Sequence, residues 1–302
     1  MTRALVLGGG GPVGIGWESG LAVGLAKAGV ELAGADAVFG TSAGSFVGAQ
    51  LALGLDVAAT VAGLIATRQP VLDAGGGDGG GRDAGAPAER MQALMDAITR
   101  AALSDGPPEE ARQAIGRLAL ESPTPTEEQF LGFFSLLAGR RWPEQFACTA
   151  VEAATGEFIL WKAGSGADLH RAVASSCSVP CVFPPVTIDG RRYIDGGMRS
   201  ALNADIAVGH DRVVVVSVMV LALPEGISNP MFEALNGQVT DELAKLRSSG
   251  SEVEVISPNQ EFLEISGWGT ALMDLDKAES AYEAGIRQGA EEAARIAALW
   301  NR

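Results

Sequence analysis

The chain has 302 residues, of which 47% are hydrophobic and 20% charged, and its formal net charge at pH 7 is −15. This composition supports a packed core and argues against global disorder. Because a strongly negative chain repels phosphates, it also argues against nucleic acid as a partner and against electrostatic docking on anionic membranes.

The cysteines and the apolar runs indicate the compartment. Cys148, Cys177 and Cys181 are an odd number in a long chain, which suits a reducing compartment better than a disulfide framework. The N-terminal apolar run is too short for a secretory signal, and the longest run, 213–223, is about half of a membrane span. We therefore expect a cytoplasmic protein and leave transient peripheral contact with a membrane open.

The first 54 residues alternate strands with helices. Short apolar segments at 3–9 and 36–40 predict buried strands, and the segments 14–29 and 42–54 predict helices. This alternation is typical of βαβ units around a parallel sheet, so the sequence predicts an α/β fold.

The segment 73–87 has seven glycines in fifteen residues, which predicts a flexible loop or a disordered segment. Three amphipathic helices are expected after it, at 88–103, 108–120 and 124–139. The third begins with a capping box, Thr126-x-x-Gln129, and carries Phe130, Phe133, Phe134 and Leu137. Core packing is the simpler interpretation of these aromatic residues. The alternative is the wall of an apolar substrate channel, with the glycine-rich segment 73–87 as its hinge.

The remaining elements return to strands and helices. Strands are expected at 145–153, 156–163, 211–220 and 252–256, helices at 168–177, 231–246 and 277–300, and a hairpin turn at Asp189-Gly190. No internal repeat and no linker is visible. We therefore expect residues 1–302 to form a single domain that includes the glycine-rich loop (73–87) and a helical insertion (88–140).

A run of glycines follows the first strand. Gly9-x-Gly11-x-x-Gly14 satisfies the short form of a dinucleotide-binding fingerprint, but the second strand does not end in the acidic residue that would hold a ribose. No Gly-Lys-Ser/Thr is present, which excludes a P-loop. Consecutive glycines at a helix N-terminus also allow backbone amides to approach an oxyanion closely. This interpretation explains the run best.

The segment "GTSAG" has the form of a nucleophile elbow, with Ser42 between Gly40 and Gly44. A capped helix start is the simpler alternative, but it requires neither glycine. We therefore predict that Ser42 is a nucleophile, which then needs a base.

Neither histidine suits the role of that base. His210 precedes a strand and should lie at the opposite rim of a parallel sheet from Ser42, while His170 lies within a predicted helix. Asp195, in "YIDGG", follows a strand, but the free aspartate pKa of about 3.9 is low for a base. Spacing alone does not decide between a base and a turn residue at Asp195.

Three motifs in order, Gly-Gly-Gly-x-x-Gly, Gly-x-Ser-x-Gly and Asp-Gly-Gly, resemble the patatin-like lipid acyl hydrolases. The block "ASSCSVPCVFPPVTIDGRRYIDGG" resembles the stretch before that family's catalytic aspartate. The resemblance covers roughly residues 4–210 and carries no motif in 73–144.

The resemblance implies a three-layer α/β/α fold with a largely parallel sheet and a lipid acyl ester substrate. It implies a Ser–Asp dyad, with Ser42 as nucleophile and Asp195 as base, and no metal or cofactor. It also implies an oxyanion hole and a set of motif glycines. The oxyanion hole would comprise the amides of Gly9, Gly10, Gly11 and Ala43, and the motif glycines would be Gly14, Gly40, Gly44, Gly196 and Gly197.

One departure from the family pattern bears on the substrate. The family has Arg or Lys immediately before the last glycine of its first motif, where this chain has Val13. A neutral ester or glyceride is therefore favoured over a phospholipid. Acyl transfer or thioester cleavage at the same site, a catalytically silent lipid-binding protein, and a nucleotide-binding protein are the alternatives.

Overall fold

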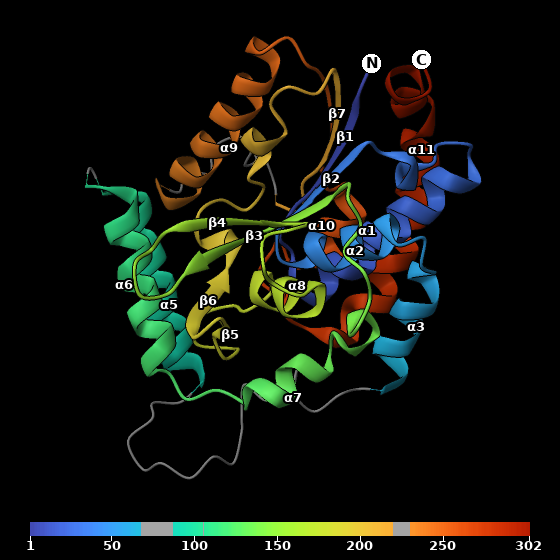
Figure 1. Cartoon of the computed structure of the whole chain (residues 1–302). Coiled ribbons are helices and arrows are strands. Elements are labelled where there is room, and N and C mark those ends of the chain that lie inside the picture. The colour runs from blue at the N-terminus through green and yellow to red at the C-terminus, as the bar shows by residue number, and fades with distance from the viewer. Residues whose placement is uncertain (68–86, 105, 220–229) are drawn as a thin grey trace.

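The computed structural model of the chain describes residues 1–67, 87–104, 106–219 and 230–302 (Figure 1). The predicted glycine-rich loop, 73–87, lies outside the described residues except for Pro87, where a helix begins.

An eight-stranded sheet lies at the centre, in the order β5-β6-β3-β2-β1-β7-β8, with β4 paired to β3. The strands are β1 (Arg3–Leu7), β2 (Ala37–Gly40), β3 (Phe146–Glu152), β4 (Phe158–Lys162), β5 (Val186–Ile188), β6 (Arg191–Asp195), β7 (Arg212–Val216) and β8 (Glu252–Ile256). The run from β3 to β8 is parallel, whereas β4, β5 and β6 pair antiparallel.

The central strands are buried on both faces. In β1, Leu5 and Leu7 join one core cluster, while Ala4 and Val6 join a second cluster on the opposite face. This explains why the strand sequences are continuous apolar runs and do not alternate with polar residues.

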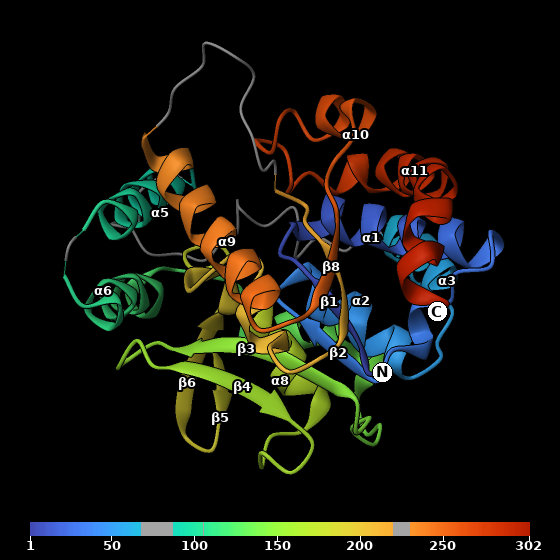
Figure 2. The ribbon, with the colours of Figure 1, turned by 90° about the horizontal axis from the view of Figure 1, so that it is seen from above.

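Helices cover both faces of the sheet. On one side lie α1 (Gly11–Lys27), α2 (Ala43–Ala52), α3 (Val57–Thr67), α8 (Leu169–Ser176), α10 (Gln260–Ile265) and α11 (Ala278–Trp300); on the other lie α5 (Pro87–Ala102), α6 (Pro108–Glu121) and α9 (Pro230–Ser248). Figure 2 shows α9, α5 and α6 on one side of the sheet and α1, α3 and α11 on the other. The three-layer α/β/α prediction is therefore confirmed.

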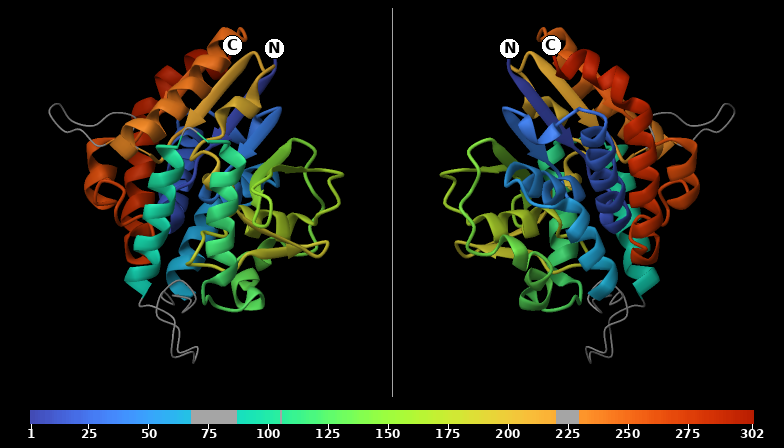
Figure 3. Two further views of the ribbon diagram at one scale, coloured as in Figure 1. Left: turned by 90° about the vertical axis from the view of Figure 1, so that its left-hand side faces the viewer. Right: turned by 90° about the vertical axis from the view of Figure 1, so that its right-hand side faces the viewer.

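The first and last helices pack on each other through glycines. A Cβ atom at Gly20 would lie 2.1 Å from the Tyr282 carbonyl oxygen, and one at Gly285 would lie 2.3 Å from the Trp17 carbonyl oxygen. The two backbones therefore approach more closely than any side chain would allow. This contact brings α11 beside α1, as Figure 3 shows in its right-hand view.

Three helical segments differ from the sequence predictions. The helix expected at 124–139 is shorter: α7 spans Glu127–Gly132 and is followed by a 3₁₀ turn, Ser135–Leu137. Gly132 disfavours continuation of the helix, and the predicted capping box at Thr126 and Gln129 is present. Helices α3 and α10 were not predicted. Across the described parts of the chain, no helix combines the length and apolar character needed to span a membrane.

Candidate active site

Ser42 lies in a sharp turn between β2 and α2, with φ 52° and ψ −120°. A Cβ at Gly40 would lie 2.4 Å from the Ser45 Cα, and one at Gly44 would lie 2.3 Å from the Leu7 carbonyl oxygen. Both glycines are therefore required by close backbone packing. Positive φ at a serine is strained, and such strain persists where the surrounding structure fixes it.

The end of α8 holds this turn in place. The Ser42 amide donates to Ser176 Oγ at 3.0 Å, and the Ser42 carbonyl accepts from Cys177 Sγ at 3.0 Å and from Ser45 Oγ at 2.7 Å. Neither Ser176 nor Cys177 was predicted as a site residue. Their only signal was their place in the block that precedes Asp195.

Asp195 ends β6, opposite Ala150 of β3. Cys148, two residues earlier in β3, lies opposite Gly40, so the register brings Asp195 to the rim that carries Ser42. The Asp195 amide donates to the Ser178 carbonyl at 2.9 Å. The segment 176–178 thus hydrogen-bonds to both Ser42 and Asp195.

The Asp195 carboxylate is almost completely buried, at 2% exposure. Its Oδ1 accepts from the Gly197 amide at 2.7 Å, whereas Oδ2 has no hydrogen-bond partner in the described part of the chain. Burial raises the pKa of Asp195 to about 7, although the Ser42 side chain and the Gly197 amide act to lower it. The Ser42 side chain is thus close enough to the carboxylate to affect its pKa.

The loop after Asp195 is packed against β3. A Cβ at Gly196 would lie 2.1 Å from Thr149 Oγ1, so only glycine fits there. The side-chain Nδ2 of the buried Asn203 donates to the Thr41 hydroxyl and to the Gly196 carbonyl, at 3.1 and 3.2 Å. Thr41 lies next to Ser42, so this network links the elbow to the Asp195 loop.

The glycine loop, residues 8–11, follows β1 and leads into α1. Some of its backbone amides are already hydrogen-bonded, and others have no acceptor in the described part of the chain. The Gly9 amide donates to the Ala201 carbonyl at 2.8 Å, which removes Gly9 from the predicted oxyanion donors. The amides of Gly10, Gly11 and Ala43 have no acceptor among the residues that the structure describes. A Cβ at Gly9 would lie 3.4 Å from the Ser42 Cβ, so the loop and the elbow are adjacent. Gly14, the last glycine of this motif, lies in the first turn of α1 and donates its amide to the Gly10 carbonyl.

The side chains of both histidines contact backbone carbonyls and not Ser42 or Asp195. His210 precedes β7, and its Nδ1 lies 2.9 Å from the Ala207 carbonyl; His170 Nε2 lies 2.8 Å from the Leu131 carbonyl. His210 is thus at the start of a parallel strand and Ser42 after the end of another, as predicted. Within the described residues, no three His, Cys, Asp or Glu side chains are grouped to hold a metal ion.

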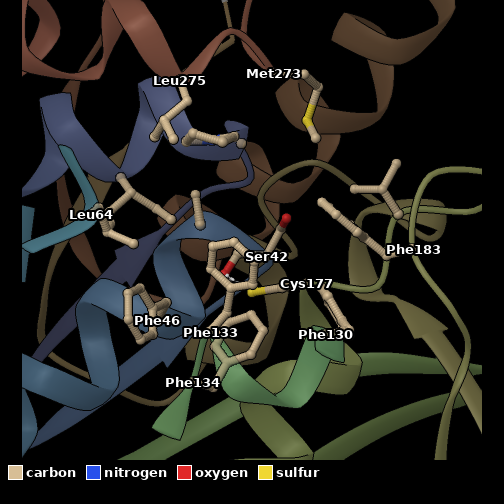
Figure 4. Close-up of a pocket in the computed structure, with 15 residues that line it drawn as sticks. Ser42, Phe46, Leu64, Phe130, Phe133, Phe134, Cys177, Phe183, Met273 and Leu275 are labelled. Carbon is tan, nitrogen blue, oxygen red and sulfur yellow. Dashed lines mark hydrogen bonds between the residues drawn. The ribbon is translucent and has the colours of Figure 1, made fainter. Parts of the chain in front are cut away.

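An apolar pocket opens beside Ser42, with an empty volume of about 540 Å³ that includes space open to solvent (Figure 4). Its lining residues are Gly11, Pro12, Ile15, Ser42, Ala43, Phe46, Leu64, Phe130, Phe133, Phe134, Cys177, Val179, Phe183, Met273 and Leu275. None of these carries a charge. The aromatic residues of the 124–139 segment therefore line a pocket as well as pack in the core.

Four of the phenylalanines that line the pocket form an aromatic wall held together by ring contacts: Phe46, Phe130, Phe134 and Phe183. Phe134 lies edge-on to Phe46 and to Phe130, each with ring centroids 5.3 Å apart, and Phe130 stacks on Phe183 at 4.6 Å. Phe46 is one helical turn after Ser42, so the wall has a fixed position relative to the serine.

Comparison with known proteins yields a family and two distant structures. A family model described as patatin-like phospholipase matches residues 5–208, more than half of the chain, whereas no curated protein matches. VipD from Legionella pneumophila is 14% identical with a TM-score of 0.46, and the similarity covers 97% of this chain and 67% of VipD. The type III effector protein ExoU is 16% identical with a TM-score of 0.35, over 96% of this chain and 53% of ExoU. The chain thus spans about half of the ExoU chain.

The family model includes the glycine loop, the elbow and the Asp195 loop. With more than half of the chain matched, this chain belongs to the patatin-like phospholipases, a family of lipid hydrolases.

Proposed function

We propose that the protein is a serine-dependent lipid acyl hydrolase that uses Ser42 and Asp195 as a dyad. One observation carries the proposal: the strained Ser42 faces an uncharged apolar pocket, and the buried carboxylate of Asp195 lies close to the Ser42 side chain. The cytoplasmic location expected from the sequence stays a prediction.

In the first step, the Ser42 hydroxyl oxygen attacks the acyl carbonyl carbon, and its proton passes to Asp195 Oδ2. The free amides of Gly10, Gly11 and Ala43 stabilise the oxyanion, helped by the positive ends of α1 and α2. The ester C–O bond then breaks, and the leaving alcohol takes the proton from Asp195. Water hydrolyses the acyl-Ser42 ester in the same way, with Asp195 as the base, and releases the fatty acid.

The pocket supports a particular class of substrate. Because the described lining residues carry no charge, the pocket suits an acyl chain and offers no cation to a phosphate. Val13, where the family has a cation, is fully buried in the core and does not line the pocket. We therefore favour a neutral ester or glyceride.

Ser42→Ala and Asp195→Asn test the proposal. Each should lower the hydrolysis of p-nitrophenyl esters at least about a thousandfold, because each removes one half of the dyad. The measurement is kcat/KM, with circular dichroism to show that the variants are folded. Undiminished hydrolysis by either variant would disprove the dyad.

The alternatives use the same pocket. Added alcohol acceptors would reveal acyl transfer through ester products, and thioester substrates would reveal a thioesterase. A catalytically silent lipid-binding protein would leave Ser42 unlabelled by a fluorophosphonate probe.

A further inference from the structure

Trp268 is exposed and its backbone is strained. Its side chain lies in the loop after α10 and is 47% exposed, with φ 56°. Its neighbours Gly267 and Gly269 also have positive φ, 57° and 90°. A bulky residue rarely adopts this conformation, and a glycine at this place would avoid the strain. The loop therefore presents an apolar ring to solvent at a cost in stability.

Hydrogen bonds fix this loop. The Trp268 amide donates to the Leu263 carbonyl at 2.8 Å, and the Ala271 amide donates to the carbonyl of the buried Ser266 at 2.9 Å. The Ser266 hydroxyl also accepts from the Gly269 amide at 3.3 Å. The exposure of Trp268 is thus built into the fold and is not the result of a loose chain.

The same loop continues into the wall of the pocket. Met273 and Leu275 line the pocket, and the Leu272 carbonyl accepts from the Val13 amide at 3.2 Å, beside the glycine loop. Met273 is five positions after Trp268 in the chain, so at most roughly 18 Å lies between their Cα atoms. Ala271, Leu272, Met273 and Leu275 are half-buried. Half-buried apolar residues thus lead along the chain from Trp268 to the pocket, with Gly269 and the exposed Thr270 between.

We propose that the segment 268–275 is a docking surface for an uncharged or zwitterionic lipid surface, with Trp268 as its anchor. Tryptophan favours the boundary between lipid and water, because its ring is apolar and its N–H is polar. Met273 and Leu275, at the end of this segment, line the same pocket as Ser42, so an acyl chain drawn from such a surface would enter beside them. This inference rests on the proposed function for the role of the pocket, but the docking itself does not require catalysis.

Charge selects the kind of lipid surface. Asp274 and Asp276 are exposed within or next to the docking surface, Glu264 is exposed nearby, and the net charge of the chain is −15. Lys277 follows at the end of this segment and is half-buried. The excess of acidic groups disfavours anionic lipid.

Vesicle flotation with the full chain tests the docking. Ser42→Ala protein is used so that the lipid stays intact, with and without Trp268→Asn, because asparagine tolerates positive φ. Phosphatidylcholine vesicles should retain the Ser42→Ala protein, and Trp268→Asn should weaken this binding about tenfold or more, since it removes a large apolar anchor. Vesicles with a third of phosphatidylserine should bind less. Leu120→Asn, at a 42% exposed leucine of α6, is the control that should not change the binding.

A kinetic comparison separates docking from catalysis. Trp268→Asn should keep the kcat/KM of the active enzyme on a soluble short-chain ester and lower the rate on an aggregated long-chain ester. Equal flotation of both proteins, or an equal loss of rate on both substrates, would overturn the inference. So would a concentration-dependent dimer that Trp268→Asn abolishes, since a second copy would then cover the surface. If Ser42→Ala keeps full activity, the proposed function fails while the flotation result still stands.

Discussion

At the scale of single residues, the main question is how the proposed base, Asp195, could accept a proton near neutral pH without a histidine. Asp195 is 2% exposed, and burial raises its pKa to about 7, near the value suited to a base at neutral pH. A sequence motif carries no information on burial, so "YIDGG" alone left a turn residue as an equal alternative. The same holds for Gly9, because only the fold brings the Ala201 carbonyl to its amide.

The raised pKa predicts an acid limb in the pH–rate profile. In the proposed mechanism Asp195 must be ionised to accept the Ser42 proton, so kcat/KM should rise from pH 5 to pH 8 with an apparent pKa of about 7. The measurement uses a soluble ester whose own ionisation lies outside this range. Glu242→Gln is the matched control, because burial also raises the pKa of Glu242, but this residue hydrogen-bonds to Ala204, outside the pocket. A profile that is flat down to pH 5 would contradict the role of Asp195.

At the scale of elements, strands were easier to predict than short helices. The β7 sequence is a run of valines, which is typical of a buried parallel strand. By contrast, α3 contains Val57, Thr60, Val61 and Gly63, which are weak helix formers. Helix α10 has six residues, too few for a periodic pattern. The early end of α7 at Gly132 precedes Phe133 and Phe134, which line the pocket; the sequence offered such a wall only as the alternative to core packing.

Phe134 is predicted to limit the length of the acyl chain. Its ring is 6% exposed, lines the pocket and contacts Phe46 and Phe130. Phe134→Leu should deepen the pocket and raise kcat/KM for longer acyl chains relative to shorter ones. Because each buried methylene contributes about 0.8 kcal/mol, room for two more would give a relative change of about tenfold. The measurement is kcat/KM over a series of p-nitrophenyl esters of increasing chain length.

Phe262→Leu is the matched control for this change. Phe262 is fully buried against Trp17, with ring centroids 4.8 Å apart, and does not line the pocket. Both variants should lose stability, but only Phe134→Leu should change the chain-length preference. The same shift in both would show that a loosened core, and not the pocket, sets the preference.

At the scale of the whole molecule, the family match ends at residue 208, but the fold does not. β7 pairs with β1 in the middle of the sheet, and α11 packs on α1, which begins at the glycine loop. The sequence predicted α11 as a helix but not its partner, because contacts between distant segments leave no periodic signal. The glycines spaced by four at Gly16, Gly20 and Gly24 were the available signal for that close packing.

Gly20→Ala tests whether the chain unfolds as one domain. The new methyl group would lie 2.1 Å from the Tyr282 carbonyl oxygen, which the backbone of α11 cannot easily avoid. We expect a loss of stability of about 1–3 kcal/mol, as for other overpacked cores. Gly237→Ala in α9 is the same chemical change with nothing within 4 Å, so it should stabilise its helix by up to about 1 kcal/mol. Thermal unfolding followed by circular dichroism and by residual esterase activity should give one coincident transition, shifted down by Gly20→Ala. If activity and helix content are lost in separate transitions, and Gly20→Ala moves only one of them, the chain contains more than one folding unit.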